Sequence, residues 1–212
     1  MFVKVCGITR LEDALHAISS GATALGFVFW PASPRCVTPD QGRTIVAALP
    51  PGVTTVGVFV NESVEVVRQT LAVSGVGTVQ LHGDETAAYA ASLAAPVFRA
   101  IAPGRDATPL QEWPADTTFL IDAHDPVRRG GTGLMVDWTY AAHLARRYRL
   151  VLAGGLTPAN VAEAIEQVQP FGVDVSSGVE AAPGVKDPRK VAAFLSSARA
   201  AFARQGPSSG ND

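Results

Sequence analysis

Two glycine-containing segments near the end of the chain have the residues needed to bind a phosphate group. VLAGGLTPANV and GVDVSSGVE each begin as a short apolar run and then break into small residues before a helix or turn. We expect Gly154 and Gly155, and likewise Ser177 and Gly178, to expose backbone N–H groups at adjacent strand ends. Such N–H groups, aided by the dipole of a following helix, hold a phosphate without a lysine. The two segments therefore predict a phosphorylated small molecule as the substrate.

A thiol and a carboxyl group near other strand ends could carry out acid–base chemistry on that substrate. Cys6 ends the apolar run FVKVC, just before a helix that Thr9 is expected to cap. A helix N-terminus lowers the pKa of a thiol, so Cys6 could act as a nucleophile or as a general base. Asp122 ends the run TTFLI, where an apolar wall would raise the pKa of its carboxyl group and favour proton donation. The alternatives are a buried core cysteine and an aspartate that only caps a turn.

Three further polar side chains are expected near the same strand ends. Arg35, in the proline-containing segment PASPR, could bind a carboxylate with its planar guanidinium group, or it could be a solvated surface residue. His82 could carry a proton, contact the ligand or pack against the backbone. Asp174 could contact the substrate or orient the phosphate-binding turn. We interpret Cys36 as incidental, and the loop Arg128–Gly133 either as a moving lid or as a plain connection.

Composition and missing motifs argue against several classes of function. The net charge is −2, which gives no electrostatic reason to expect nucleic acid or an anionic membrane as a partner. The four histidines lack metal-ligand spacing, and neither a Walker A lysine motif nor a strand–GxGxxG–helix fingerprint occurs. We therefore expect no metal and no cofactor. No apolar stretch approaches the roughly 20 residues of a membrane span and no secretory signal precedes the first strand, so a cytoplasmic location is expected.

Eight short β-rich runs must position these side chains. They alternate with segments rich in alanine, leucine and glutamate, as in repeated β–α units whose parallel strands are buried on both faces. The 212 residues favour an α/β fold with a single-domain (β/α)₈ TIM barrel over residues 1–204 and a disordered tail at 205–212. The carboxyl ends of the strands would then form the active site. A doubly wound open sheet is the alternative. The runs are FVKVCG, TALGFVFW, TTVGVFVN, VGTVQLHG, PVFRAIA, TTFLIDA, RLVLAGGL and GVDVSSGV.

Several motifs, taken together, resemble those of one enzyme family. Between Lys4 and Asp187 the chain contains, in this order, KVCGIT, ALGFVFWPASPR, VGVFVN, VQLHGDE, LIDA, GGTG, LAGGLTPANV and VDVSSGVEAAPGVKD. This set resembles the phosphoribosylanthranilate isomerases of tryptophan biosynthesis. Two departures lie in the loop expected near the aromatic end of the substrate. Trp30 stands where the family often has tyrosine, and Cys36 stands where a larger residue is common.

The resemblance implies an Amadori rearrangement that needs neither metal nor cofactor. N-(5-phosphoribosyl)anthranilate would become 1-(2-carboxyphenylamino)-1-deoxyribulose 5-phosphate. By motif, Asp122 would be the general acid that protonates the furanose ring oxygen. Cys6, as a thiolate, would be the general base that removes the C2 proton. Arg35 would bind the anthranilate carboxylate, and the backbone of the two glycine-containing segments would bind the phosphate.

Two other functions remain open at this point. Another phosphate-binding barrel enzyme, such as a sugar-phosphate epimerase or indoleglycerol-phosphate synthase, would need metal ligands or catalytic lysines at strand ends. Lys4 lies earlier in its strand, and the other runs lack such a lysine. A non-catalytic barrel that only binds a phosphorylated metabolite would not need both Cys6 and Asp122. The sequence does not distinguish a monomer from a homodimer.

Overall fold

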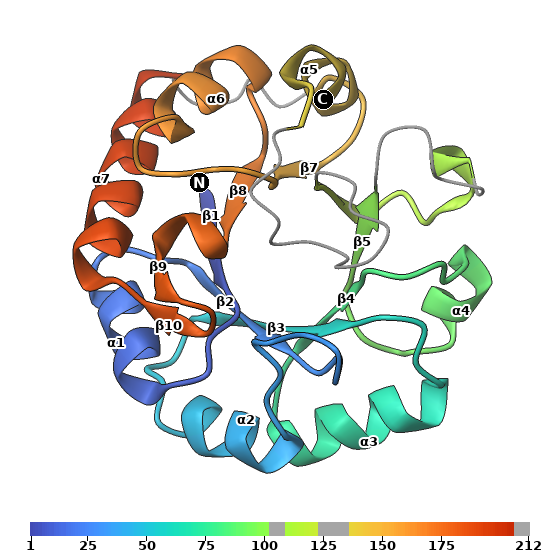
Figure 1. The fold of residues 1–212 in the computed structure, drawn as a ribbon. Helices are drawn as coiled ribbons and strands as arrows, with labels where there is room; N and C mark the ends of the chain where they lie inside the picture. Colours follow the sequence, from blue (N-terminus) through green and yellow to red (C-terminus); the bar gives the residue numbers. More distant parts are fainter. Residues whose placement is uncertain (102–108, 123–135, 206–212) are drawn as a thin grey trace.

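The eight β-rich runs form the eight strands of a closed parallel barrel. A computed structural model of the chain describes residues 1–101, 109–122 and 136–205. Within these residues the strands follow one another around the barrel in sequence order, as Figure 1 shows. The alternative of an open sheet is wrong, because the first strand pairs in parallel with the last. The strands are β1 (Phe2–Cys6), β2 (Ala24–Val28), β3 (Thr54–Phe59), β4 (Thr78–Leu81), β5 (Val97–Ile101), β6 (Thr118–Ile121), β7 (Leu150–Leu152) and β8 (Gly172–Val175).

Helices surround the barrel and cover its outer face (Figure 1). In α6 the buried residues recur at helical spacing from Val161 to Val168, which gives an apolar stripe. The long helix α7 packs against both α6 and α1 and so closes the ring. The helices are α1 (Leu11–Ser19), α2 (Pro39–Val46), α3 (Val64–Ser74), α4 (Ala87–Ala91), α5 (Trp138–Ala145), α6 (Val161–Val168) and α7 (Pro188–Arg204), and a 3₁₀ turn, η1 (Leu110–Glu112), precedes β6.

The barrel interior changes from apolar to polar along the strands. Because side chains alternate along a strand, β1 directs Phe2, Lys4 and Cys6 into the interior in that order. Phe2 packs with Phe98 and with other inward side chains of β5, β6 and β7, and closes the amino-terminal end of the barrel. The layer above contains the buried side chain of Lys4, and Cys6 lies at the carboxyl-terminal mouth. The fold therefore places the polar side chains where a parallel barrel binds its ligands.

A small antiparallel hairpin between β8 and α7 was not predicted from the sequence. After the 3₁₀ turn η2 (Ser177–Val179), strands β9 (Glu180–Ala182) and β10 (Val185–Lys186) pair beside α1, as Figure 1 shows. The predicted cap of α1 by Thr9 is wrong for a related reason. The Thr9 hydroxyl donates a hydrogen bond to the carbonyl oxygen of Gly184 in this hairpin, and α1 begins at Leu11 without a side-chain cap.

In the part of the chain that the structure describes, no helix is long and apolar enough to span a membrane.

Candidate active site

The residues predicted to bind phosphate line one pocket at the mouth of the barrel. Gly154 and Gly155, which follow β7, have φ angles of 78° and 68°, a left-handed conformation that favours glycine. Asn160 holds their turn by accepting a hydrogen bond from the Thr157 N–H and donating one to the Gly155 carbonyl. The pocket walls are Asp122, Ala153, Gly154, Gly155, Leu156, Asp174, Val175, Ser176, Ser177 and Gly178.

Gly178 is required by close packing between the two segments predicted to bind phosphate. A Cβ atom at this position would lie 1.9 Å from the carbonyl oxygen of Leu156, in the turn that follows β7. The backbone of η2 therefore lies directly against that turn. The two segments are close in sequence and in space, and they form one surface. This agrees with the prediction that they lie at adjacent strand ends.

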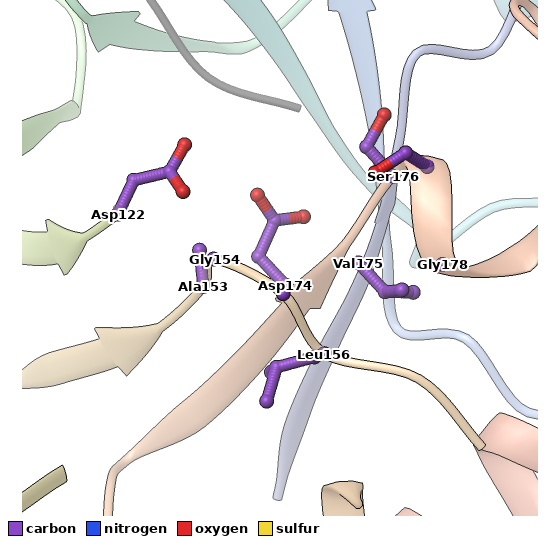
Figure 2. A pocket seen from close by; sticks show the side chains of 10 residues that line it. Asp122, Ala153, Gly154, Leu156, Asp174, Val175, Ser176 and Gly178 are labelled. Atoms are coloured by element: carbon purple, nitrogen blue, oxygen red, sulfur yellow. The ribbon is translucent and has the colours of Figure 1, made fainter. Parts of the chain in front are cut away.

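Two carboxyl groups project into the same pocket. Figure 2 shows Asp122 and Asp174 reaching into it from the ends of β6 and from β8, with Gly154 between the two strands. Asp122 Oδ2 lies 3.7 Å from Nε2 of His82, across the barrel mouth. The His82 Nδ1 atom is 3.0 Å from the side-chain amide nitrogen, Nε2, of Gln80, a buried residue of β4. Because this amide donates to Nδ1, the proton of neutral His82 is on Nε2, facing Asp122.

Cys6 is buried at the carboxyl-terminal end of β1. Its sulfur packs beside Val28 and Val58, with the partly buried Trp30 against them. Burial raises the pKa of the Cys6 thiol above its ordinary value, while Lys4 and Lys186 act in the opposite direction. The sequence predicted a lowered pKa from the helix N-terminus. That direction is wrong, because α1 begins only at Leu11 and desolvation of the thiolate is the larger effect.

A buried ion pair connects the Cys6 strand with the pocket. Lys4 Nζ lies 2.8 Å from Oδ2 of Asp174, and the Lys4 side chain is completely buried. The other oxygen, Oδ1, is also buried and has no hydrogen-bond partner among the described residues. The sequence indicated only that Lys4 lies earlier in its strand than a catalytic lysine at a strand end would. Its position two residues before Cys6, on the same face of an apolar strand, is the signal that predicts its proximity to Cys6.

Arg35 is held beside the site by a carboxylate of the protein itself. Its Nε and Nη2 atoms donate to the two oxygens of Glu180, at 2.8 and 2.7 Å. Lys186 Nζ lies 2.8 Å from the same carboxylate. Burial alone would raise the pKa of Glu180, but the hydrogen bonds from Arg35 and the charge of Lys186 hold it below its ordinary value. The predicted carboxylate-binding arginine is thus oriented by Glu180, which sequence reasoning missed.

The Arg35 side chain reaches the Cys6 region by crossing Gly7. A Cβ atom on Gly7 would lie 2.5 Å from Arg35 Cδ, and Gly7 has a φ angle of 75°. A side chain at this position would therefore be strained and would also displace the arginine. The cysteines at positions 6 and 36 are both free.

Two further expectations concern the loop Arg128–Gly133 and metal binding. The loop lies outside the described residues. Among the residues that are described, no group of three or more histidine, cysteine, aspartate or glutamate side chains could hold a metal ion.

Comparison with known proteins shows which family the chain resembles. The family model described as N-(5′phosphoribosyl)anthranilate (PRA) isomerase matches residues 3–197. An N-(5′-phosphoribosyl)anthranilate isomerase of Pelobacter propionicus is 50% identical over 195 residues, which cover 91% of this chain and 93% of that protein. The crystal structure of phosphoribosyl anthranilate isomerase from Thermotoga maritima has a TM-score of 0.87 and 41% identity, covering 94% of this chain and 99% of that one.

A further solved structure contains a ligand. It is a phosphoribosyl anthranilate isomerase in complex with reduced 1-(o-carboxyphenylamino)-1-deoxyribulose 5-phosphate. This structure is 39% identical to the chain with a TM-score of 0.81, and the match covers 94% of this chain and 99% of the solved chain. The family model matches most of the chain, and the identity with these relatives extends over nearly its whole length. The chain therefore belongs to the N-(5′-phosphoribosyl)anthranilate isomerase family.

Proposed function

We propose that this enzyme converts N-(5-phosphoribosyl)anthranilate into 1-(2-carboxyphenylamino)-1-deoxyribulose 5-phosphate, a step of tryptophan biosynthesis, by general acid–base catalysis. The observation that supports this mechanism best is the pocket that combines Asp122 with the phosphate-binding backbone of Gly154, Gly155 and Gly178. Cys6, at the end of β1, which pairs with the strand of Asp174, is the base. A phosphate held by backbone N–H groups would fix the sugar between the two proton-transfer groups.

Asp122 acts first, as the general acid. It donates a proton to the furanose ring oxygen, and the bond between that oxygen and C1 breaks. The lone pair of the anilino nitrogen forms a C1=N double bond, which gives a ring-opened iminium cation. His82, whose Nε2 lies 3.7 Å from Asp122 Oδ2, orients the carboxyl group during this transfer.

Cys6 acts second, as the general base. Its thiolate removes the proton from C2, and the electron pair moves toward the cationic nitrogen to give an enolamine. The enolamine tautomerises to the ketone, so that the reaction is an isomerisation with no atom gained or lost. The iminium nitrogen is the electron sink, which is why this chemistry needs no metal or cofactor. Burial raises the pKa of the Cys6 thiol, so its thiolate is also a stronger base for removing the C2 proton.

The remaining contacts account for substrate recognition. The Glu180 carboxylate binds one edge of the Arg35 guanidinium, so the other edge is directed at the anthranilate carboxylate. Val28, Val58 and Trp30 beside Cys6 supply an apolar surface for the anthranilate ring. The buried Oδ1 atom of Asp174 accepts a hydrogen bond from a sugar hydroxyl, which satisfies an atom that otherwise has no partner among the described residues.

A fluorescence assay tests the reaction. Freshly prepared N-(5-phosphoribosyl)anthranilate is mixed with enzyme dialysed against a chelator, and the loss of anthranilate-linked fluorescence is followed while the product is identified by mass spectrometry. We expect rapid loss and formation of the ketose isomer without added metal. An epimerised sugar, an indole product or dependence on added metal would contradict the proposal. The expectation of a cytoplasmic location stays a prediction, as does the choice between monomer and homodimer.

A further inference from the structure

We propose that Lys4 is a positioning residue for Cys6, and that its buried ammonium group stabilises the thiolate that removes the substrate proton. The part of this proposal that concerns the reaction rests on the role of Cys6 proposed above. The part that concerns the thiolate can be tested without any substrate. The Lys4 side chain is completely buried, so we assign it no contact with the reacting atoms.

The packing around Gly26 brings Lys4 and Cys6 together. Both residues lie on β1 and point into the barrel, one layer apart. A Cβ atom on Gly26 of β2 would lie 2.6 Å from Cys6 Sγ and 3.0 Å from Lys4 Cε. The sulfur and the end of the lysine chain therefore pass over the same glycine. No other amino acid at position 26 would leave room for both.

Lys4 keeps its positive charge in spite of complete burial. Burial would lower the pKa of the ammonium group, but the charges of Asp174 and Cys6 raise it above its ordinary value. Asp174 Oδ2 accepts a hydrogen bond from one of the three N–H groups of the ammonium, at 2.8 Å. The lysine acts on the Cys6 thiol as a nearby charge and also as a hydrogen-bond donor. It therefore opposes the desolvation that makes a buried thiolate unfavourable.

The other charges that face Cys6 have smaller or opposite effects. Asp174 on β8 disfavours the thiolate, and Lys186 on β10 favours it. The charge of Cys6 also raises the pKa of Arg35, which lies in the segment after β2. Lys186 and Arg35 share the Glu180 carboxylate, which neutralises part of their combined charge. Among these groups, Lys4 is the cation that acts most strongly on the thiol.

The pH dependence of thiol alkylation tests this role. In a Cys36→Ser background, which leaves Cys6 as the single cysteine, iodoacetamide alkylation is followed from neutral to alkaline pH. Lys4→Met should slow alkylation at least about tenfold at every pH below the thiol pKa, because an adjacent cation favours the thiolate to that extent. Lys4→Arg should restore much of the rate. The ascending limb of kcat/KM should move to higher pH in Lys4→Met in parallel.

A second pair of variants avoids an unpaired buried carboxylate. Lys4→Met leaves Asp174 without its cation, and this can prevent folding. We therefore also compare Asp174→Asn with the double variant Lys4→Met/Asp174→Asn, in which neither charge is left unpaired. Alkylation should be slower in the double variant over the same pH range. The same pH dependence with and without Lys4, in either comparison, would overturn the proposal.

The controls separate this proposal from the proposed reaction. If Cys6→Ala keeps full turnover, Cys6 is not the base and the catalytic part fails, while the alkylation result still reports the effect of Lys4 on the thiol. If Cys6→Ala is inactive but alkylation does not depend on Lys4, the reaction stands and the role of Lys4 fails.

Discussion

The two sides of the barrel mouth hold the proposed proton-transfer groups, Cys6 and Asp122, in different ways. On the side of β1 and β8, Cys6 is buried next to Lys4, Asp174 and Lys186, all of them charged. On the side of β4 and β6, the Asp122 side chain is 14% exposed and faces His82 at 3.7 Å. One side is a compact set of buried ions, and the other is a partly exposed carboxyl group near a ring nitrogen.

The difference matches the form in which each group is proposed to work. A base that acts as a buried anion needs cations nearby, because desolvation raises the pKa of its thiol. A general acid must be protonated, and this form carries no charge, so it needs no buried cation. We infer that the Cys6 side requires a complete set of charges, whereas the Asp122 side tolerates more change. Four predictions test this difference.

The largest effects are expected when either proposed proton-transfer group is removed. Cys6→Ala and Asp122→Asn should each lower kcat by about 10²–10⁴-fold, the usual contribution of positioned proton transfer. The backbone proposed to hold the phosphate is unchanged, so both variants should bind a phosphate-containing product analogue nearly as tightly as the parent. Steady-state fluorescence kinetics and calorimetry measure the two quantities. A variant with near-normal turnover would remove that residue from the mechanism.

The next effect concerns stability on the Cys6 side. Glu180→Gln leaves Arg35 and Lys186 without their shared carboxylate, and breaking such a buried pair typically destabilises a protein by about 3–5 kcal/mol. The folded-state pKa of Glu180 lies below its ordinary value. Its stabilising effect is therefore complete above the unfolded-state pKa and disappears as the pH falls through the folded-state pKa. Urea denaturation at several pH values measures the difference between parent and variant.

The matched control is the exposed ion pair between Arg204 and Glu166. Glu166→Gln removes the same kind of contact at the surface, where both side chains are more than half exposed. Its cost should be at most about 1 kcal/mol. Equal losses of stability in Glu180→Gln and Glu166→Gln at neutral pH would show that the buried charges near Cys6 matter no more for stability than an exposed ion pair.

The sequence predicts the barrel and its mouth because local patterns determine both. Each strand is a nearly continuous apolar run, and the residue that ends it must lie at the carboxyl-terminal end of the sheet. This is how Asp122 and the two segments predicted to bind phosphate are found, and the structure brings them into one pocket.

The charge pairs around Cys6 could not be predicted in the same way. Lys4 and Asp174 are 170 residues apart, and they meet only because β1 pairs with β8 when the barrel closes. Arg35 and Glu180 are 145 residues apart, and their contact depends on the hairpin β9–β10, whose strands are too short to leave a pattern. The predicted pKa shift of Cys6 had the wrong direction for the same reason, since burial depends on these distant neighbours.

A smaller effect is expected for the arginine that Glu180 orients. Arg35→Met should weaken substrate binding by about tenfold to a hundredfold, since hydrogen bonds to charged groups contribute about 1.5–3 kcal/mol. The loss should appear mainly in KM, because the carboxylate is bound equally before and during the reaction. A substrate analogue without the carboxyl group provides the comparison. If its kinetics suffer as much as those of the natural substrate, Arg35 does not bind the carboxylate.

The smallest effect is expected on the Asp122 side. His82→Leu removes the Nε2–H group that faces Asp122, and His82→Gln keeps a side-chain donor. A neutral hydrogen bond contributes about 0.5–1.5 kcal/mol, so His82→Leu should lower kcat by no more than about tenfold, and His82→Gln by less. The distance of 3.7 Å also argues for a weak contact. Stability should change less than in Glu180→Gln, because no buried ion loses its partner. If His82→Leu were as inactive as Asp122→Asn, the proton would pass through the imidazole, and the two sides would be equally demanding.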